Sequence, residues 1–200
     1  MAVGTVNCGS AGHHTLSPTG VFKGSWVDLG TSAINNASES QIIAEVARGV
    51  SHFGDTSDGV QYVIDFPHGV YPNGFAAQSG GTYCAYHDNA SIGGAQIAFT
   101  NMPYMTDAGA SCGANFVNGG SAGTLDGVTI VGGHEYTETI TDQWPSLQYA
   151  WVDSRTSENA DKCAWVSTGS GAAGDVSLNG KSYALQSLWS NLANGCVLTS

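Results

Sequence analysis

The spacing of apolar residues predicts an amphipathic helix in the first third of the chain. Apolar side chains recur at helical intervals at Ile42, Ile43, Val46 and Val50. Just before them, Ser38-Glu39-Ser40-Gln41 has the pattern of a capping box, in which a serine and a glutamine side chain bond free backbone N–H groups. We therefore expect a helix over residues 39–52 that packs on a sheet and has His52 at its end.

Alternating apolar and polar residues, rich in β-branched and aromatic types, predict a set of strands. They cover residues 21–29, 60–66, 82–87 and 96–102. Near the end of the chain, Asn179-Gly180 separates two strand-like stretches within 176–185, which is typical of a β-hairpin. The second stretch continues toward Trp189. Residues 67–74 follow a predicted strand and form a loop of the kind that often contacts substrates.

A second helix is predicted over residues 125–141. Its first half is apolar enough to be buried, and Pro145 prevents Trp144 from continuing the helix. The pair Gly132-Gly133 weakens an isolated helix by roughly 1 kcal/mol per glycine. We expect a close backbone contact to be the reason for these glycines.

Helices and strands mixed along one chain predict an α+β fold. We expect a single domain over residues 1–200, with a mixed sheet, two helices and a C-terminal hairpin, because no linker or internal repeat divides the chain. Residues 1–20 show no periodicity and are expected to form an irregular arm, whose adjacent His13 and His14 face different ways and are not expected to bind metal. Long loops are expected at residues 102–120 and 144–165.

Charge and composition exclude several classes of partner. The 200 residues include 16 acidic and only 5 basic side chains, a formal net charge of −11 at pH 7. Nucleic acid and anionic membranes both require cationic protein surface and are therefore excluded as partners. No stretch of about 18 apolar residues could span a bilayer. The first residues lack the basic and apolar segments of a signal peptide, and we expect the processed form of a secreted monomer.

Five cysteines in a chain rich in glycine, serine and threonine indicate an extracellular protein with disulfide bonds. The sequence alone does not fix the pairing. We expect Cys84 to pair with Cys112 and Cys163 to pair with Cys196. Cys8 is then the odd thiol.

The second predicted helix carries a metal-binding pattern, His134-Glu135-Tyr136-Thr137-Glu138. Residues four apart lie about 40° apart on one helix face, so the side chains of His134 and Glu138 can reach one ion. Glu135 points about 100° away, where it could contact a water molecule on that ion. The arrangement is that of the zinc-peptidase pattern H-E-x-x-H, with glutamate in the second ligand position.

A zinc site needs a third ligand, and acidic residues farther along the chain supply candidates. Acidic side chains crowd residues 126–161, where basic residues are almost absent, and a bound cation would offset their repulsion. We expect Glu158 to be the third ligand, and Asp161 to accept the remaining N–H of the His134 imidazole. Asp142 is the alternative ligand, better suited to Ca²⁺ or to helix capping.

These blocks resemble the gluzincins, the thermolysin-like metallopeptidases, in which a glutamate on a downstream segment is the third zinc ligand. The chain is also similar to a group of secreted bacterial and fungal proteins and to the plant phosphate-induced, or exordium-like, proteins. The similarity covers about residues 60–196 and rests on five blocks, 84–87, 133–138, 141–142, 158–163 and 180–189. It implies a secreted protein with a zincin-like fold.

On this interpretation the protein is a zinc-dependent endopeptidase. One catalytic Zn²⁺, held by the two helix ligands and Glu158, would activate water, with Glu135 as the general base for attack on a protein or peptide substrate. Candidates for stabilising the oxyanion are His87, Tyr136 and His68, with His87 ranked first. Two carboxylate ligands neutralise the charge of Zn²⁺ and make it a weaker Lewis acid, and they also suit Ca²⁺ or Mn²⁺.

Other functions fit parts of the same sequence. The main alternative is a secreted cell-wall or carbohydrate-associated binding protein whose cation only braces residues 158–163. A glycosidase using Glu135 and Glu158 is another, with the five tryptophans as sugar platforms, and a serine triad is a third. The simplest alternative has no metal, and Glu135 and Glu138 would then form a solvated helix face.

Overall fold

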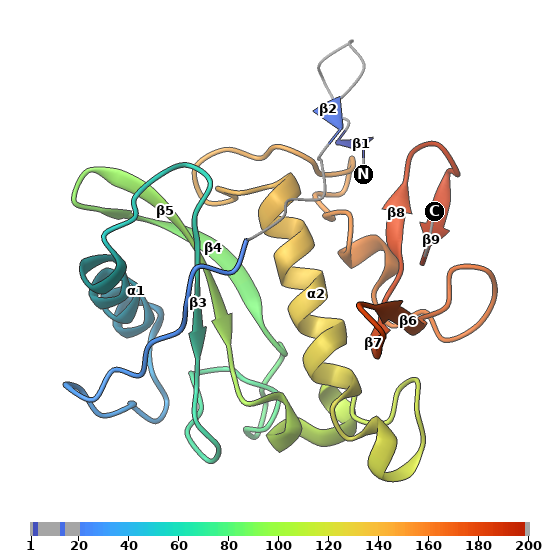
Figure 1. Ribbon diagram of the computed structural model, residues 1–200, viewed down its shortest axis with the longest axis horizontal. Helices are drawn as coiled ribbons and strands as arrows, with labels where there is room; N and C mark the ends of the chain where they lie inside the picture. Colours follow the sequence, from blue (N-terminus) through green and yellow to red (C-terminus); the bar gives the residue numbers. More distant parts are fainter. Residues whose placement is uncertain (1, 4–12, 15–20, 199–200) are drawn as a thin grey trace.

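The computed structural model describes residues 2–3, 13–14 and 21–198, and its architecture is mixed α+β (Figure 1). The helices are α1 (Glu39–Phe53) and α2 (Asp126–Thr141), with short 3-10 segments η1 (Met105–Cys112), η2 (Gly120–Gly123) and η3 (Asp161–Cys163). The strands are β1 (Ala2–Val3), β2 (His13–His14), β3 (Gln61–Asp65), β4 (Tyr86–Ile92), β5 (Ala95–Met102), β6 (Gly174–Leu178), β7 (Lys181–Leu185), β8 (Leu188–Ser190) and β9 (Gly195–Val197).

Three strands form the central sheet, in the order β3-β5-β4. Strand β3 runs parallel to β5, whereas β4 and β5 form an antiparallel hairpin. Gly93 and Gly94 close this hairpin with φ values of 60° and 89°, which glycine adopts at little cost. The sheet is therefore mixed, as expected.

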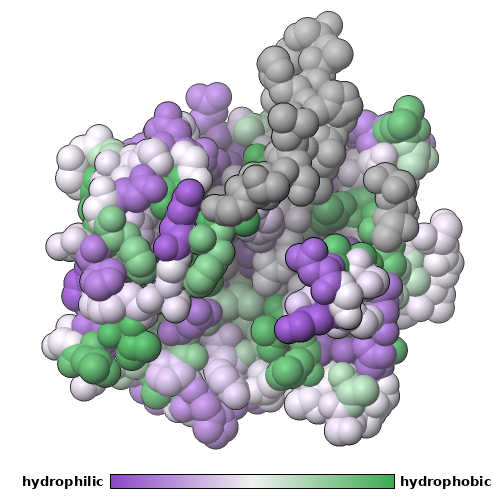
Figure 2. All heavy atoms as spheres, in the orientation of Figure 1, coloured by the Kyte–Doolittle hydropathy of each residue, from purple (hydrophilic) through white to green (hydrophobic). Residues whose placement is uncertain are grey.

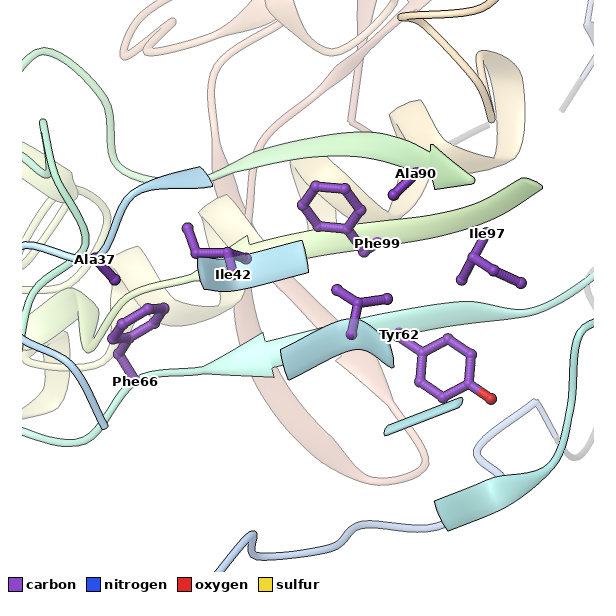
Figure 3. Close-up of a cluster of buried hydrophobic side chains, with 8 residues drawn as sticks. Ala37, Ile42, Tyr62, Phe66, Ala90, Ile97 and Phe99 are labelled. Carbon is purple, nitrogen blue, oxygen red and sulfur yellow. The ribbon is translucent and has the colours of Figure 1, made fainter. Parts of the chain in front are cut away.

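The main hydrophobic core lies between this sheet and α1. Ile42 and Val46 of the helix are 2% and 0% exposed and pack with Tyr62, Ile97 and Phe99 of the sheet (Figure 3). Burial of each such aliphatic side chain contributes about 1.5–3 kcal/mol to folding. The helix begins at the predicted capping box, so both the start of α1 and its buried face are confirmed.

The opposite face of the sheet meets α2. Gln61 Nε2 donates a hydrogen bond to Thr139 Oγ1 of α2 at 2.7 Å, and it also donates to Thr100 of β5. His87 pairs with Thr100 across the β4–β5 hairpin, so the two residues lie on the same face of the sheet. The strand register therefore brings His87 toward α2.

The C-terminal hairpin packs against the other side of α2. Asn179 and Gly180 form its two-residue turn with φ values of 51° and 75°, as the sequence predicts. Thr129 Oγ1 of α2 donates to the Ala184 carbonyl of β7 at 2.6 Å. The chain past β7 does not continue this strand, because β8 pairs instead with β9.

Two disulfides confirm the predicted pairing, Cys84 with Cys112 and Cys163 with Cys196. The first ties the residues before β4 to the end of η1, and the second ties η3 to β9. Cys8 lies outside the described residues. Within the described part of the chain, each disulfide thus anchors a segment with little regular structure to a strand or its flank.

Two strand predictions need correction. Residues 21–29 form no strand, because the region stays exposed and has no partner strand; Trp26 instead stacks on His52 with ring centroids 4.4 Å apart. The strand expected at 82–87 begins only at Tyr86 and extends to Ile92. Its expected first half instead bonds the loop at residues 74–76: the Tyr83 carbonyl accepts the Ala76 N–H and the Thr82 N–H donates to the Gly74 carbonyl, both at 2.9 Å.

The molecular surface mixes polar and apolar residues. Hydrophilic and hydrophobic side chains are interspersed over the face seen in Figure 2. Among the described residues, no helix has the length and apolar character needed to cross a membrane.

Helix α2 makes its closest backbone approach near its start, at Gly127. A Cβ built on Gly127 would lie 1.9 Å from the Cys112 carbonyl oxygen. The pair Gly132-Gly133 was expected to have this role, but the nearest atoms there belong to the side chains of Met102 and Leu185, at 3.2 and 3.5 Å. The glycine that permits close packing is therefore Gly127.

Substitution of Gly127→Ala should strongly destabilise the protein, because the methyl group would overlap the Cys112 carbonyl and push α2 away. We expect a loss of about 3 kcal/mol or more in the free energy of unfolding, measured by urea titration. Gly133→Ala is the matched control, since it should be neutral or stabilise by up to about 1 kcal/mol through helix propensity. Equal effects at both positions would contradict this packing account.

Candidate metal centre

Helix α2 brings the residues of the predicted motif together. His134 Nε2 lies 3.1 Å from Glu138 Oε2, one helical turn away, as the four-residue spacing predicts. Glu135 and Glu138 are only 5% and 2% exposed. The alternative of a solvated helix face is therefore wrong, because both carboxylates are withdrawn from water.

Threonine side chains allow this polar stretch of α2 to be buried. The hydroxyls of Thr137, Thr139 and Thr141 donate to backbone carbonyls one turn earlier, at distances of 2.8, 2.9 and 3.0 Å. Their hydrogen-bonding needs are thus met largely within the helix, and the carboxylates must find other partners.

The segment around η3 supplies the other acidic residues. The backbone N–H of Asp161 donates to Glu138 Oε1 at 2.9 Å, which seats the segment on α2. Lys162 turns away from the centre, since its Nζ pairs with Asp153 at 2.8 Å and lies 4.2 Å above the Trp189 ring. Lys162, the lysine nearest to these acidic residues in the sequence, therefore neutralises Asp153, which lies outside the cluster.

His87 approaches the helix from β4 and is almost fully buried, with 7% exposure. Its Nε2 lies 2.9 Å from the Asp142 carbonyl oxygen and 3.4 Å from Glu158 Oε1. Its Nδ1 lies 3.6 and 3.7 Å from Oε2 of Glu135 and Glu138, respectively. Within the described part of the chain, the polar contacts of this imidazole are therefore all with oxygen atoms.

These side chains form two groups with spacing suited to a metal ion, and both groups include Glu138. One group contains His134, Glu138 and Asp161, and the other contains His87, Glu138 and Glu158; within each, the ligand atoms lie within 4.8 Å of one another. The structure thus brings His134 and Glu138 together but places Glu158 with His87. The Oδ1 atom of Asp161 lies 3.5 Å from His134 Nε2.

The other nitrogen of His134 bonds to Gln186, which the sequence analysis did not identify. Gln186 Nε2 donates to the carbonyls of Ala160 and Ser187 at 2.9 and 3.2 Å, so its Oε1 must accept the bond from His134 Nδ1 at 3.0 Å. A neutral His134 would then direct its Nε2 lone pair at two carboxylates. Such an arrangement requires a positive charge at Nε2, either a proton or a metal ion.

The pKa values show how strongly this cluster holds positive charge. Burial alone would lower the pKa of His134, but hydrogen bonds with Asp161 and Glu138 outweigh it and raise the pKa to about 11. His87 is also desolvated, yet Glu135 and Glu158 raise its pKa to about 9. Burial, followed by the charge of Glu138, raises the pKa of Glu158 to about 8. In the absence of a metal, the cluster retains protons at neutral pH.

Two buried carboxylate oxygens in this region accept no hydrogen bond. They are Glu158 Oε1 and Asp142 Oδ2. Asp142, which the sequence suggests as an alternative ligand, is fully buried and belongs to neither group. It follows the last residue of α2, and its Oδ1 accepts a hydrogen bond from the Ala150 N–H at 2.7 Å. The imidazole and carboxylate donors, with an orphaned buried oxygen at Glu158, fit a divalent cation.

A cleft of about 390 Å³ opens onto one side of the centre. His134, Glu135, Asp161, Gln186 and Tyr83 are among its lining residues. The three oxyanion candidates, His87, Tyr136 and His68, are not among its lining residues. In the first metal group, His134 and Asp161 therefore line the cleft. In the second group, His87 and Glu158 do not line it.

The structure offers little support for a serine triad. Two stretches match the Gly-x-Ser-x-Gly pattern, 109–113 and 119–123, but both lie in 3-10 segments rather than at a turn from strand to helix. Ser111 lines the cleft, yet neither its hydroxyl nor that of Ser121 bonds a histidine among the described residues. The chemistry of the cleft therefore resides in its imidazole and carboxyl groups.

Comparisons with known proteins add no relative. No protein-family model matches the chain, and neither the curated proteins nor the solved structures give a significant match.

The stability of the metal-free protein should fall as pH rises from about 4.5 to 8. The folded-state pKa of Glu158 is raised from 4.5 to about 8, so its contribution is fully present below pH 4.5 and is lost as pH rises through 8. We expect Glu158→Gln to remove part of this decline, on the order of a few kcal/mol. Urea unfolding with a chelator at pH 5 and pH 8 measures both proteins, and identical pH slopes would contradict the raised pKa.

Proposed function

We propose that this protein is a metal-dependent hydrolase that cleaves peptide bonds, with one catalytic divalent cation, Zn²⁺, at His134, Glu138 and Asp161. The observation that carries the proposal is that two of these ligands and Glu135 line one cleft. Asp161 replaces Glu158 as the third ligand because the hydrogen bond from its backbone N–H to Glu138 brings its carboxylate close to His134. When bound, the ion supplies Lewis-acid chemistry, which makes water more acidic and polarises a carbonyl.

Glu135 is suited to act as the general base. It follows His134 in the helix, lines the cleft and is only 5% exposed, so water entering the cleft meets its carboxylate in a largely dry setting. His87 Nδ1 lies 3.6 Å from Oε2 of Glu135, so a positive charge on the imidazole would favour the ionised carboxylate. Glu135 would accept a proton from the attacking water and pass it to the leaving amine.

Gln186 holds the metal-binding nitrogen in place. Its bond to His134 Nδ1 leaves Nε2 free to bind the ion, as second partners of histidine ligands commonly do. Its amide group is also bonded to the Ala160 carbonyl, next to Asp161. One side chain thus orients two of the three ligands.

Several features favour a zincin-like, secreted form of this hydrolase. The resemblance to gluzincins and to secreted exordium-like proteins depends on the same blocks that meet at the centre, 84–87, 133–138 and 158–163. Two disulfides suit an extracellular location. The competing proposal, a binding protein in which the cation only braces residues 158–163, predicts metal-dependent stability without hydrolysis.

Substitution of Glu135→Gln should abolish proteolysis, by a factor of about 10² or more, while metal content and melting temperature stay close to those of the wild type. Hydrolysis of an unfolded protein substrate, elemental analysis and thermal unfolding provide the three measurements. Glu45→Gln on α1 is the matched control and should retain full activity. Chelation should abolish activity and Zn²⁺ should restore it.

If Glu135→Gln remains active, the assigned base is wrong. A wild-type protein that binds metal and gains stability from it, yet cleaves no substrate, would instead support the binding-protein alternative.

Substitution of Gln186→Leu should weaken Zn²⁺ binding by about 10- to 100-fold, because the His134 ring loses the acceptor that fixes its tautomer. Titration calorimetry with Zn²⁺ measures the change in affinity. Gln78→Leu, at a glutamine outside the cleft, controls for the loss of an amide and should leave the affinity unchanged. An unaltered affinity in Gln186→Leu would remove Gln186 from the centre.

A further inference from the structure

The proposed hydrolase leaves His87 and Glu158 without a direct part in the reaction, although both are buried beside Glu138. Their side chains are 3% and 17% exposed. Neither residue lines the cleft, whereas His134 and Asp161 do. The two metal-binding groups are therefore separate positions that share one carboxylate.

Both nitrogens of the His87 ring have oxygen atoms as their neighbours. The Asp142 carbonyl and Glu158 lie next to Nε2, and Glu135 and Glu138 lie next to Nδ1. A neutral imidazole has a proton on one nitrogen and a lone pair on the other. With either tautomer, the lone pair would face oxygen acceptors unless a cation lies between them.

Glu158 provides a second, independent observation. Its Oε1 is buried and accepts no hydrogen bond, although it is close to His87 Nε2. Among the described residues, no lysine or arginine forms an ion pair with Glu158, Glu138 or Glu135. A buried carboxylate oxygen without a donor is costly, and a bound ion would satisfy it.

We propose that a second divalent cation binds His87, Glu138 and Glu158, and that Glu138 bridges it to the ion of the cleft. The two carboxylates and one imidazole suit a borderline ion such as Zn²⁺ or Mn²⁺ better than Ca²⁺, which prefers oxygen ligands alone. The site joins β4, α2 and the segment before η3, none of which is linked to another by a disulfide. Its ion has a structural role, because its other two ligands, His87 and Glu158, do not line the cleft.

The number of bound ions tests this proposal without any assay of hydrolysis. Metal-free wild-type protein titrated with Zn²⁺ should bind two equivalents, counted by calorimetry and elemental analysis. Glu158→Gln should bind one equivalent, and Asp161→Asn should bind one equivalent at the other position. Glu138→Gln, which removes the shared ligand, should weaken both sites by at least about 10-fold.

Spectroscopy on the unmodified protein guards against variants that fail to fold. With Mn²⁺ as the probe, two ions bridged by one carboxylate give an exchange-coupled electron paramagnetic resonance spectrum, and a single ion does not. Circular dichroism checks that each variant is folded before its equivalents are counted.

One equivalent in the wild type, with an uncoupled Mn²⁺ spectrum and no change in Glu158→Gln, would overturn the second site and identify His87 as an imidazolium. Failure of the hydrolase proposal has a different outcome, since a protein without proteolytic activity would still bind two equivalents. The two proposals are thus tested separately.

Discussion

The centre of this protein is governed by one electrostatic constraint, the burial of several carboxyl groups with too few positive partners. Glu135, Glu138 and Asp142 are nearly or fully withdrawn from water, and Glu158 is mostly so. Among the described residues, the imidazoles of His87 and His134 are the only ion-pair partners of these three glutamates. Burial of unpaired carboxylates opposes folding, so protons or cations must be bound.

The surrounding fold positions these groups with ordinary elements. The alternation of β4 turns His87 toward α2, the helix spacing aligns His134 with Glu138, and a backbone N–H seats Asp161 on Glu138. Close packing at Gly127 determines the position of α2 relative to the end of η1. Strand β4 is stabilised in the apolar core beneath α1, α2 through Val131 in a second apolar cluster with Phe75 and Met105, and η3 by a disulfide. This stability offsets the cost of the acidic cluster.

Local pattern was enough to predict the elements whose signals lie within a few residues. The capping box predicted the start of α1, and Asn179-Gly180 predicted the hairpin of β6 and β7. The four-residue spacing predicted the contact between His134 and Glu138. The exposed residues 21–29 had strand composition but no partner strand, which a single sequence does not show.

Tertiary contacts decided the parts of the centre that sequence spacing did not predict. Glu158 and Asp161 are three residues apart on one irregular segment, and only the bond from the Asp161 backbone to Glu138 determines which of them reaches His134. Gln186 lies 52 residues from His134, and although it falls within the block 180–189, no spacing pattern links it to the imidazole. Its role depends on an amide orientation that two backbone carbonyls impose.

The contact between Gln186 and His134 also bears on how the molecule is made. The centre draws on residues from His87 to Gln186, so it has a high contact order and cannot assemble until Gln186 has emerged from the ribosome. A nascent chain that ends just after α2 contains the helix ligands but neither Asp161 nor the amide that orients the imidazole. The complete set of metal-binding and orienting side chains would therefore be present only after synthesis has passed Gln186, just after β7.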